Sequence, residues 1–227
     1  LVQGQGGGIE QGWTYGIWVN NDGIVSAGGS GNVTVTGTGG TGSADFNTGV
    51  VVSAELGDAR ITSNGGDVLV EGQGVGTALS GNNRGVFLWK GGVITAGETG
   101  SVTVVGNGGH SEILGDHGVL IDNLSEDGRR STITSGGGVL TVTGTGGTGA
   151  SSVGVGVEDG GLIRGPVDLE TTIVGQGGAI GNGVFVLREK DGVKSTIGSL
   201  GGDIRIEATG AGNQRSGLYM FDNGQIQ

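Results

Sequence analysis

Two acidic residues, Asp122 and Glu158, are the best candidates for catalysis in this sequence. Each closes a short apolar segment, GVLID in one case and GVGVE in the other, so both hold the same position in a similar pattern. Two carboxyl groups about 5 Å apart can act as general acid and nucleophile in glycoside hydrolysis. Whether this pair comes so close depends on the elements that carry it.

The same region also supplies oxygen donors of the kind that calcium prefers. Neither an EF-hand loop nor the calcium-binding β-roll repeat GGxGxDxUx occurs, so calcium has no recognisable motif here and we expect no resident cofactor. If calcium does bind, the candidate ligands are Asp116, Asp122, Asp127, Glu158 and Asp159.

Composition excludes several classes of protein. The chain has 227 residues, of which 58 are glycine and none is cysteine, and its formal net charge is −11. An acidic chain repels a phosphate backbone, and no basic cluster is longer than Arg129-Arg130, so we expect no nucleic-acid partner. No apolar stretch approaches the roughly 20 residues that cross a bilayer, so we expect no membrane insertion. Without cysteine, a disulfide framework is excluded.

A repeat organises the glycines. An alternating segment that closes on glycine recurs at nearly even spacing, followed by a second segment such as GVFLW (85–89) and a short third one such as RITSNGG (60–66). Each unit therefore predicts three short β-strands in roughly 34 residues, repeated about six and a half times. The clearest copies of the first segment are NVTVTGTGG (32–40), DVLVEGQGV (67–75), SVTVVGNGG (101–109), VLTVTGTGG (139–147) and ETTIVGQGG (170–178).

Three strands per unit predict a coil with three flat faces. Each strand pairs in parallel with its equivalent one rung away, at about 4.8 Å, and only the stack of rungs can bury a continuous core. Sustained helical periodicity is absent from the sequence. We therefore predict an all-β parallel β-helix, with residues 1–227 forming one solenoid domain.

This pattern resembles the right-handed parallel β-helix, the fold of pectate-lyase-like enzymes and of many bacterial surface adhesins. The GGxVxVxGxGG texture is most similar to the long repeat regions of adhesin-type, autotransporter-like or filamentous-haemagglutinin-like proteins. The resemblance covers nearly the whole chain. It implies a secreted or surface-displayed bacterial protein, of which this chain would be one piece.

Two columns of the second strand carry an apolar stripe. Positions that alternate with the inward aliphatic residues should face outward, yet six of the nine aromatic residues fall on them (the chain has three Trp, two Tyr and four Phe). This is why both faces of GVFLW are apolar. The candidate ligand-binding residues on the stripe are Trp18, Phe87, Trp89, Leu120, Phe185, Tyr219 and Phe221.

Two interpretations of this aromatic stripe stay open. The long loop after the first strand, such as residues 38–48, can fold over it and make a small satellite core, since a monomer seldom leaves a large apolar patch in water. Alternatively, the stripe is a docking face for sugar rings or a partner protein.

The resulting expectation is a structural and adhesive segment that attaches to a cell-surface glycan or protein, or acts as a rigid spacer, without being an enzyme. A pectate-lyase-like lyase or hydrolase with Asp122 and Glu158 at its site is the alternative. The other expected partners are neighbouring segments of the same chain, because strand edges at the two ends of the stack favour end-to-end association. The expected location is extracellular or the bacterial cell surface.

Overall fold

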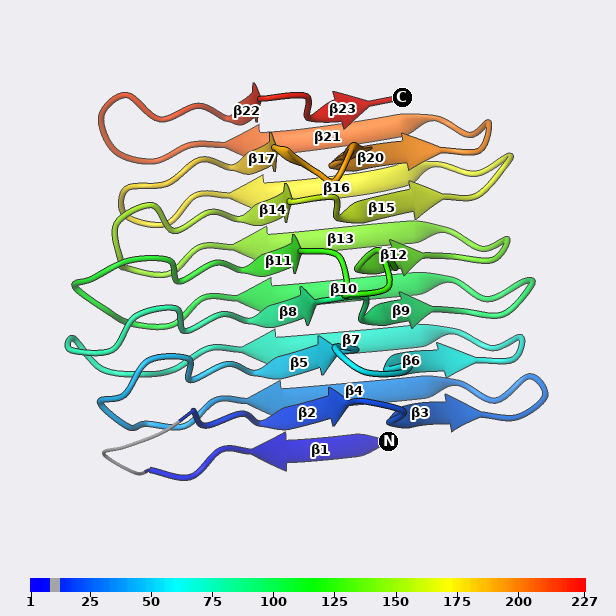
Figure 1. The fold of residues 1–227 in the computed structure, drawn as a ribbon, viewed down its shortest axis with the longest axis horizontal. Helices are drawn as coiled ribbons and strands as arrows, with labels where there is room; N and C mark the ends of the chain where they lie inside the picture. Colours follow the sequence, from blue (N-terminus) through cyan, green and yellow to red (C-terminus); the bar gives the residue numbers. More distant parts are fainter. Residues whose placement is uncertain (9–12) are drawn as a thin grey trace.

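The predicted parallel β-solenoid is confirmed by the computed structural model, which describes residues 1–8 and 13–227. Three seven-stranded parallel sheets run the length of the molecule, and each turn of the chain adds one strand to each sheet. The two termini lie at opposite ends of the stack (Figure 1). In the described part of the chain, no helix is long and apolar enough to cross a membrane.

The strands fall into three sets, one per sheet. Sheet A consists of β1 (Val2–Gln5), β4 (Val33–Thr38), β7 (Val68–Gln73), β10 (Val102–Asn107), β13 (Leu140–Thr145), β16 (Thr171–Gln176) and β21 (Ile204–Thr209). Sheet B consists of β2 (Ile17–Asn20), β5 (Val50–Ser53), β8 (Val86–Trp89), β11 (Val119–Asp122), β14 (Val155–Glu158), β17 (Val184–Leu187) and β22 (Leu218–Phe221). Sheet C consists of β3 (Ile24–Ala27), β6 (Arg60–Ser63), β9 (Val93–Thr95), β12 (Thr132–Thr134), β15 (Leu162–Gly165), β20 (Thr196–Ser199) and β23 (Gln225–Ile226).

A glycine at the next-to-last position of each sheet A strand from β1 to β16 marks the register of the stack. These glycines pair with one another from turn to turn, and the last of them pairs with Ala208. At Gly106 an added Cβ would lie only 2.1 Å from the carbonyl oxygen of Gly118, the residue just before β11 in the same turn. Glycine is needed here because the chain passes so close to its own backbone at the corner between sheets A and B.

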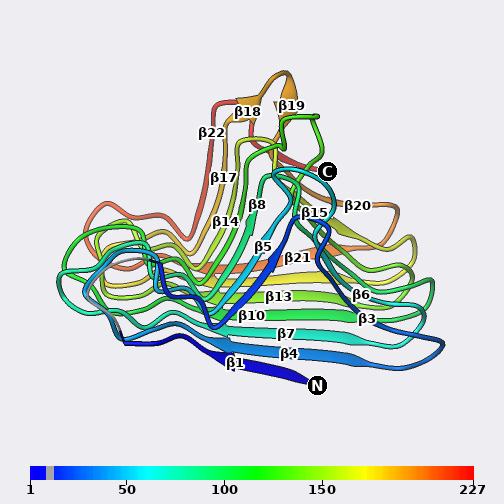
Figure 2. The ribbon, with the colours of Figure 1, turned by 60° about the horizontal axis from the view of Figure 1, so that its bottom comes forward.

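The three sheets surround a common interior (Figure 2), and the buried aliphatic side chains of the core lie there. Its aliphatic side chains come from alternate positions of each strand, as the period of two predicts, and those of the inner turns are fully buried. Burial of this apolar surface is the main stabilising contribution to such a stack. One column of sheet A illustrates the repetition, with no exposed surface at Val35, Val70, Val104, Val142 and Ile173.

One departure from the repeat is a small hairpin between sheets B and C. Strands β18 (Glu189–Lys190) and β19 (Val193–Lys194) pair antiparallel at the apex of the cross-section in Figure 2. The two turn residues, Asp191 and Gly192, both have positive φ, of 51° and 77°, which fits the Asp-Gly preference of tight hairpins. The repeat pattern did not predict this hairpin because, among the described residues, the nearest equivalent at this corner is a single isolated antiparallel bridge between Leu124 and Arg130.

Candidate functional site

The two outward columns of sheet B are aligned as the sequence predicted. Trp18 pairs with Val51, Val51 with Phe87 and Phe87 with Leu120, and the column continues to Tyr219. In the second column, Asp122 pairs with Trp89 on one side and with Glu158 on the other. The stack therefore brings the stripe residues together, and the loops determine which of them are covered and which stay open.

In its middle the stripe is covered. Leu120 and Phe185 are 1% and 6% exposed, and they form a cluster with Val153, which we call the satellite core. Val153 lies in the loop between β13 and β14, so the covering comes from the segment that the sequence suggested. The prediction that Leu120 and Phe185 face a ligand is wrong, because both side chains are packed in this cluster and neither lines the cavity found on the stripe. Phe87 and Leu187 pack against the edge of the cluster.

Two neighbouring residues, Gly156 and His117, help to position Phe185 in the satellite core. An added Cβ at Gly156 would lie 2.5 Å from the Phe185 ring, so the glycine leaves room for that ring in the column. His117 meets the same ring edge-on, with 5.8 Å between ring centroids, and its Nδ1 accepts a hydrogen bond from the Val153 backbone N–H. Burial lowers the pKa of His117 to about 3, and nearby Arg84 contributes in the same direction, so this imidazole is neutral and structural.

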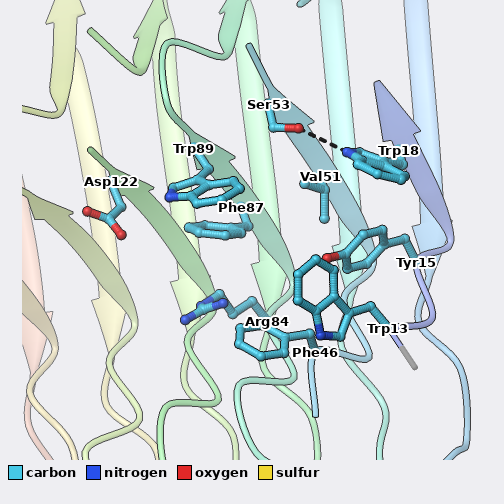
Figure 3. A pocket seen from close by; sticks show the side chains of 10 residues that line it. All are labelled: Trp13, Tyr15, Trp18, Phe46, Val51, Ser53, Arg84, Phe87, Trp89 and Asp122. Atoms are coloured by element: carbon cyan, nitrogen blue, oxygen red, sulfur yellow. Dashed lines mark hydrogen bonds between the residues drawn. The ribbon is translucent and has the colours of Figure 1, made fainter. Parts of the chain in front are cut away.

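Towards the N-terminal end the stripe opens into a cavity of about 330 Å³, which we call the aromatic pocket. Val51 lies between Trp18 on one side and the Phe87 and Trp89 pair on the other (Figure 3). Three more aromatic residues complete the rim from loops between sheets A and B. The ten lining residues are Trp13, Tyr15, Trp18, Phe46, Val51, Ser53, Arg84, Phe87, Trp89 and Asp122.

The rings of the pocket support one another. Tyr15 meets Trp18 edge-on with centroids 5.4 Å apart, and Trp13 lies 5.4 Å from Phe46. Such edge and tilted contacts suit the quadrupoles of aromatic rings. The Trp18 indole is also fixed by a 2.9 Å hydrogen bond from its Nε1 to Ser53 Oγ. The rim is therefore organised without a ligand, as is usual for binding pockets.

Arg84 extends against the underside of two of these rings. Its guanidinium carbon lies 4.3 Å from the centroid of Phe87 and 5.4 Å from that of Phe46. Nη2 donates a 2.9 Å hydrogen bond to Asn82 Oδ1, whereas Nε and Nη1 are buried without a hydrogen-bond partner among the described residues. Burial lowers the pKa of Arg84, and an arginine nonetheless keeps its charge at neutral pH.

The predicted acidic pair lies at the boundary between the pocket and the covered part of the stripe. Burial, with the charges of Glu158 and then Asp159, raises the pKa of Asp122 to about 7. Burial also raises the pKa of Glu158, which is bound by Arg188 through a 2.6 Å ion pair. Arg188 also binds Asp159, at 2.7 Å. Asp122 is the member of the group that lines the pocket, and its Oδ1 has no hydrogen-bond partner among the described residues.

The five calcium candidates do not form one site. Asp116 is buried and accepts hydrogen bonds from Ser111 Oγ at 2.6 Å and from the backbone N–H groups of Asn83 and Gly149, so it ties neighbouring turns together. Asp127 forms an ion pair with Arg129 at 2.8 Å. Across residues 1–8 and 13–227, no group of three or more His, Cys, Asp or Glu side chains is placed to hold a metal ion.

Of the predicted ligand-binding residues, Trp18, Phe87 and Trp89 line the pocket, and Tyr219 and Phe221 form an exposed stacked pair at the far end of the stripe. The sequence did not single out the other aromatic residues of the pocket or its buried arginine. A signal was nevertheless present, because the three aromatic residues outside the columns all lie in loops of the first two turns. The residues missed were Trp13, Tyr15, Phe46 and Arg84.

Comparison with known proteins adds no relative. The chain matches no family model, and it has no match among curated proteins or among solved structures.

Proposed function

We propose that this chain is an adhesive segment of a β-solenoid, in which the stacked turns form a stiff scaffold and the aromatic pocket binds a group on a cell-surface glycan or protein. The observation that supports this proposal most is the convergence of loop and strand aromatics around an open cavity. Six of the nine aromatic residues line it (the chain has three Trp, two Tyr and four Phe). A segment that served only as a spacer would need regular columns and no such cavity.

The position of the pocket also suits adhesion. It lies on the outer face of sheet B, where backbone hydrogen bonds to the neighbouring turns hold every strand that contributes to it. Sites built on such rigid elements lose little conformational freedom on binding. The resemblance of the repeat to surface adhesins supports an extracellular or cell-surface location.

The first test is a glycan-array and cell-attachment assay of the whole chain, with calcium and with chelator. We expect binding by the wild type and a loss of about tenfold or more in the Trp18→Ala/Trp89→Ala double variant, since buried aromatic contacts dominate binding energies. The matched control is Tyr219→Ala/Phe221→Ala, which removes two exposed rings outside the pocket. Attachment that depends on the control pair and not on the pocket pair contradicts the proposal.

The ends of the stack offer a second kind of partner, a neighbouring segment of the same chain. In the terminal turns, residues of the inward columns are exposed as well: Val2 is 38% and Met220 is 42% exposed. Open strand edges tend to pair with other strands. Sedimentation velocity at increasing protein concentration should therefore show end-to-end association, and a constant sedimentation coefficient speaks against it.

A carbohydrate lyase or hydrolase is the second candidate function. It is favoured by one observation, the carboxyl group of Asp122 with its raised pKa of about 7, next to Glu158 and within the pocket lining. A carboxyl that keeps its proton near neutral pH can act as a general acid. The test is a reducing-sugar assay on pooled polysaccharides; cleavage that disappears in Asp122→Asn supports an enzyme, and no cleavage by the wild type argues against it.

A further inference from the structure

Arg84 places a buried positive charge beside the aromatic pocket without a countercharge at ion-pair distance. The residue is only 8% exposed, and among the described residues no carboxylate forms an ion pair with it. Two of its guanidinium nitrogens lack hydrogen-bond partners in that part of the chain. A buried charge in this condition is costly, so its retention next to a cavity points to an anion that completes it.

The pocket also holds the carboxyl group of Asp122, whose negative charge would oppose an anionic ligand, but its raised pKa of about 7 leaves it largely protonated below that pH. The other polar groups agree with an anionic ligand. Burial raises the pKa of Tyr15 to about 12, so its phenol stays protonated and is able to donate a hydrogen bond. Ser53 Oγ is already engaged, because it accepts from Trp18 and donates to Asn20 Oδ1 at 3.1 Å. The remaining lining is mostly aromatic, and it fits the flat apolar part of a ligand.

We propose that the aromatic pocket binds a flat apolar group that carries one carboxylate, with the rings of Trp18, Phe87 and Trp89 contacting the apolar part and Arg84 binding the carboxylate. This inference rests on the proposed function, since it names the chemistry of the group that the adhesive pocket holds. A guanidinium fork matches a carboxylate in shape as well as charge.

Other ligand classes fit less well. A cationic ligand would meet the charge of Arg84, and a neutral sugar would leave that charge without an ion-pair partner. The chain as a whole carries a formal net charge of −11, which repels anions at long range. A preference for a carboxylate must therefore come from a local contact, and Arg84 is the one cationic residue among the described residues that line the pocket.

The test uses pairs of probes that differ only in charge. Phenylacetate and phenylacetamide represent a free aromatic acid, and N-acetyl-phenylalanine and its amide represent the C-terminus of a protein partner. All three tryptophans of the chain line the pocket, so intrinsic tryptophan fluorescence reports binding at this site specifically. We expect at least one acid to bind about tenfold more tightly than its amide. The pair that shows the preference identifies the source of the carboxylate.

Two variants test the role assigned to Arg84. Arg84→Met should abolish the preference for acid over amide and leave amide binding in place, with an unchanged or higher melting temperature, because an unpaired buried charge is removed. Arg84→Lys keeps the charge without the fork and should retain part of the preference. The matched control is Arg129→Met, which changes an arginine outside the pocket and should leave the preference intact. Val51→Phe should fill the cavity and abolish binding of both probes.

The outcomes separate this inference from the proposed function. Equal affinities for acid and amide, no binding of either acid, or a preference that survives in Arg84→Met each overturn the carboxylate assignment. Cell attachment without an acid preference overturns only this assignment and leaves the adhesive role standing. An acid preference without attachment to any cell or glycan supports the carboxylate assignment and overturns the adhesive role, because the pocket then binds its ligand for another purpose.

Discussion

The apolar stripe has an open part and a covered part, and both are built from the same two columns of sheet B. The side chains of the open part face a cavity, and those of the covered part are buried. Around Trp18 and Phe87 the outward side chains line a cavity, whereas Leu120 and Phe185 form the satellite core. The strands that carry them are equally regular in both parts. The strand pattern therefore does not decide whether an outward apolar residue binds a ligand or packs internally.

The difference comes from the loops and from one small residue. In the covered part Val153 comes down onto Leu120, and Gly156 leaves space for the ring of Phe185. In the open part the loops contribute rings, Trp13 and Phe46, which contact each other at the rim and leave the cavity over Val51 unfilled. A β-solenoid can thus build a site on any turn by changing what its loops place over the outer face.

The largest expected effect is a difference in the free energy of unfolding between a variant of the covered part and a variant of the open part. Leu120→Ala should lower the free energy of unfolding by about 3–5 kcal/mol, because it leaves a cavity in the satellite core. Trp18→Ala removes a larger side chain from the open part, where it is 54% exposed, and should cost less than about 1 kcal/mol. Urea denaturation followed by circular dichroism measures both. Comparable losses in the two variants would mean that the open part is also core.

A smaller effect is expected at the boundary between the two parts. In the folded state Asp122 keeps its proton up to about pH 7, whereas its ordinary pKa is 3.8, so the unfolded chain releases the proton earlier. The free energy of unfolding should therefore fall as the pH rises from about 4 to 7 and level off above. The loss is on the order of 2–3 kcal/mol, below the full shift because the residue stays partly exposed.

Asp122→Asn tests this pH dependence. The variant cannot titrate at this position, so it should lose most of the fall and be more stable than the wild type at pH 8. Unfolding measured at half-unit steps between pH 4 and pH 8 gives the comparison, with Asp127→Asn as a control for an exposed carboxyl. Parallel pH profiles for the wild type and Asp122→Asn would show that the carboxyl titrates normally.

The smallest expected effect concerns the space beside Phe185. Gly156→Ala should lower the free energy of unfolding by about 1–2 kcal/mol, because the added methyl group forces the Phe185 ring to move. Gly28→Ala is the matched control, since nothing lies within 4 Å of a Cβ built there. Thermal unfolding of the pair gives the difference. Equal melting temperatures would show that the ring has room to spare.

Most of the fold could be predicted from the sequence because a solenoid repeats its local rules. The glycine of each first strand, such as Gly72 or Gly106, stands where the chain passes its own backbone, so its recurrence marks the turns. Alternation of apolar and polar residues then gave the inward columns and the register of sheet B. The hairpin of β18 and β19 escaped prediction because paired strands form at this corner in one of the described turns alone, and a repeat pattern carries no information about single departures.

The candidate site could be predicted only in part. The sequence placed Trp18, Phe87 and Trp89 on outward columns, and the structure places them around one cavity. It gave no reason to join Phe46 or Arg84 to them, because the backbone repeats at these loop positions but the residue types there change from turn to turn. It also left open which turns of the stripe are covered.

By itself, the sequence determined the parallel stack, its register and the side chains that face away from the main core, since these follow from the two-residue period and from glycine spacing. Only the tertiary structure decided where the stripe is buried and where it opens into a pocket. That outcome depends on non-repeating loop residues, Val153 over one part and Phe46 and Arg84 beside the other, which meet the stripe only when the turns are stacked.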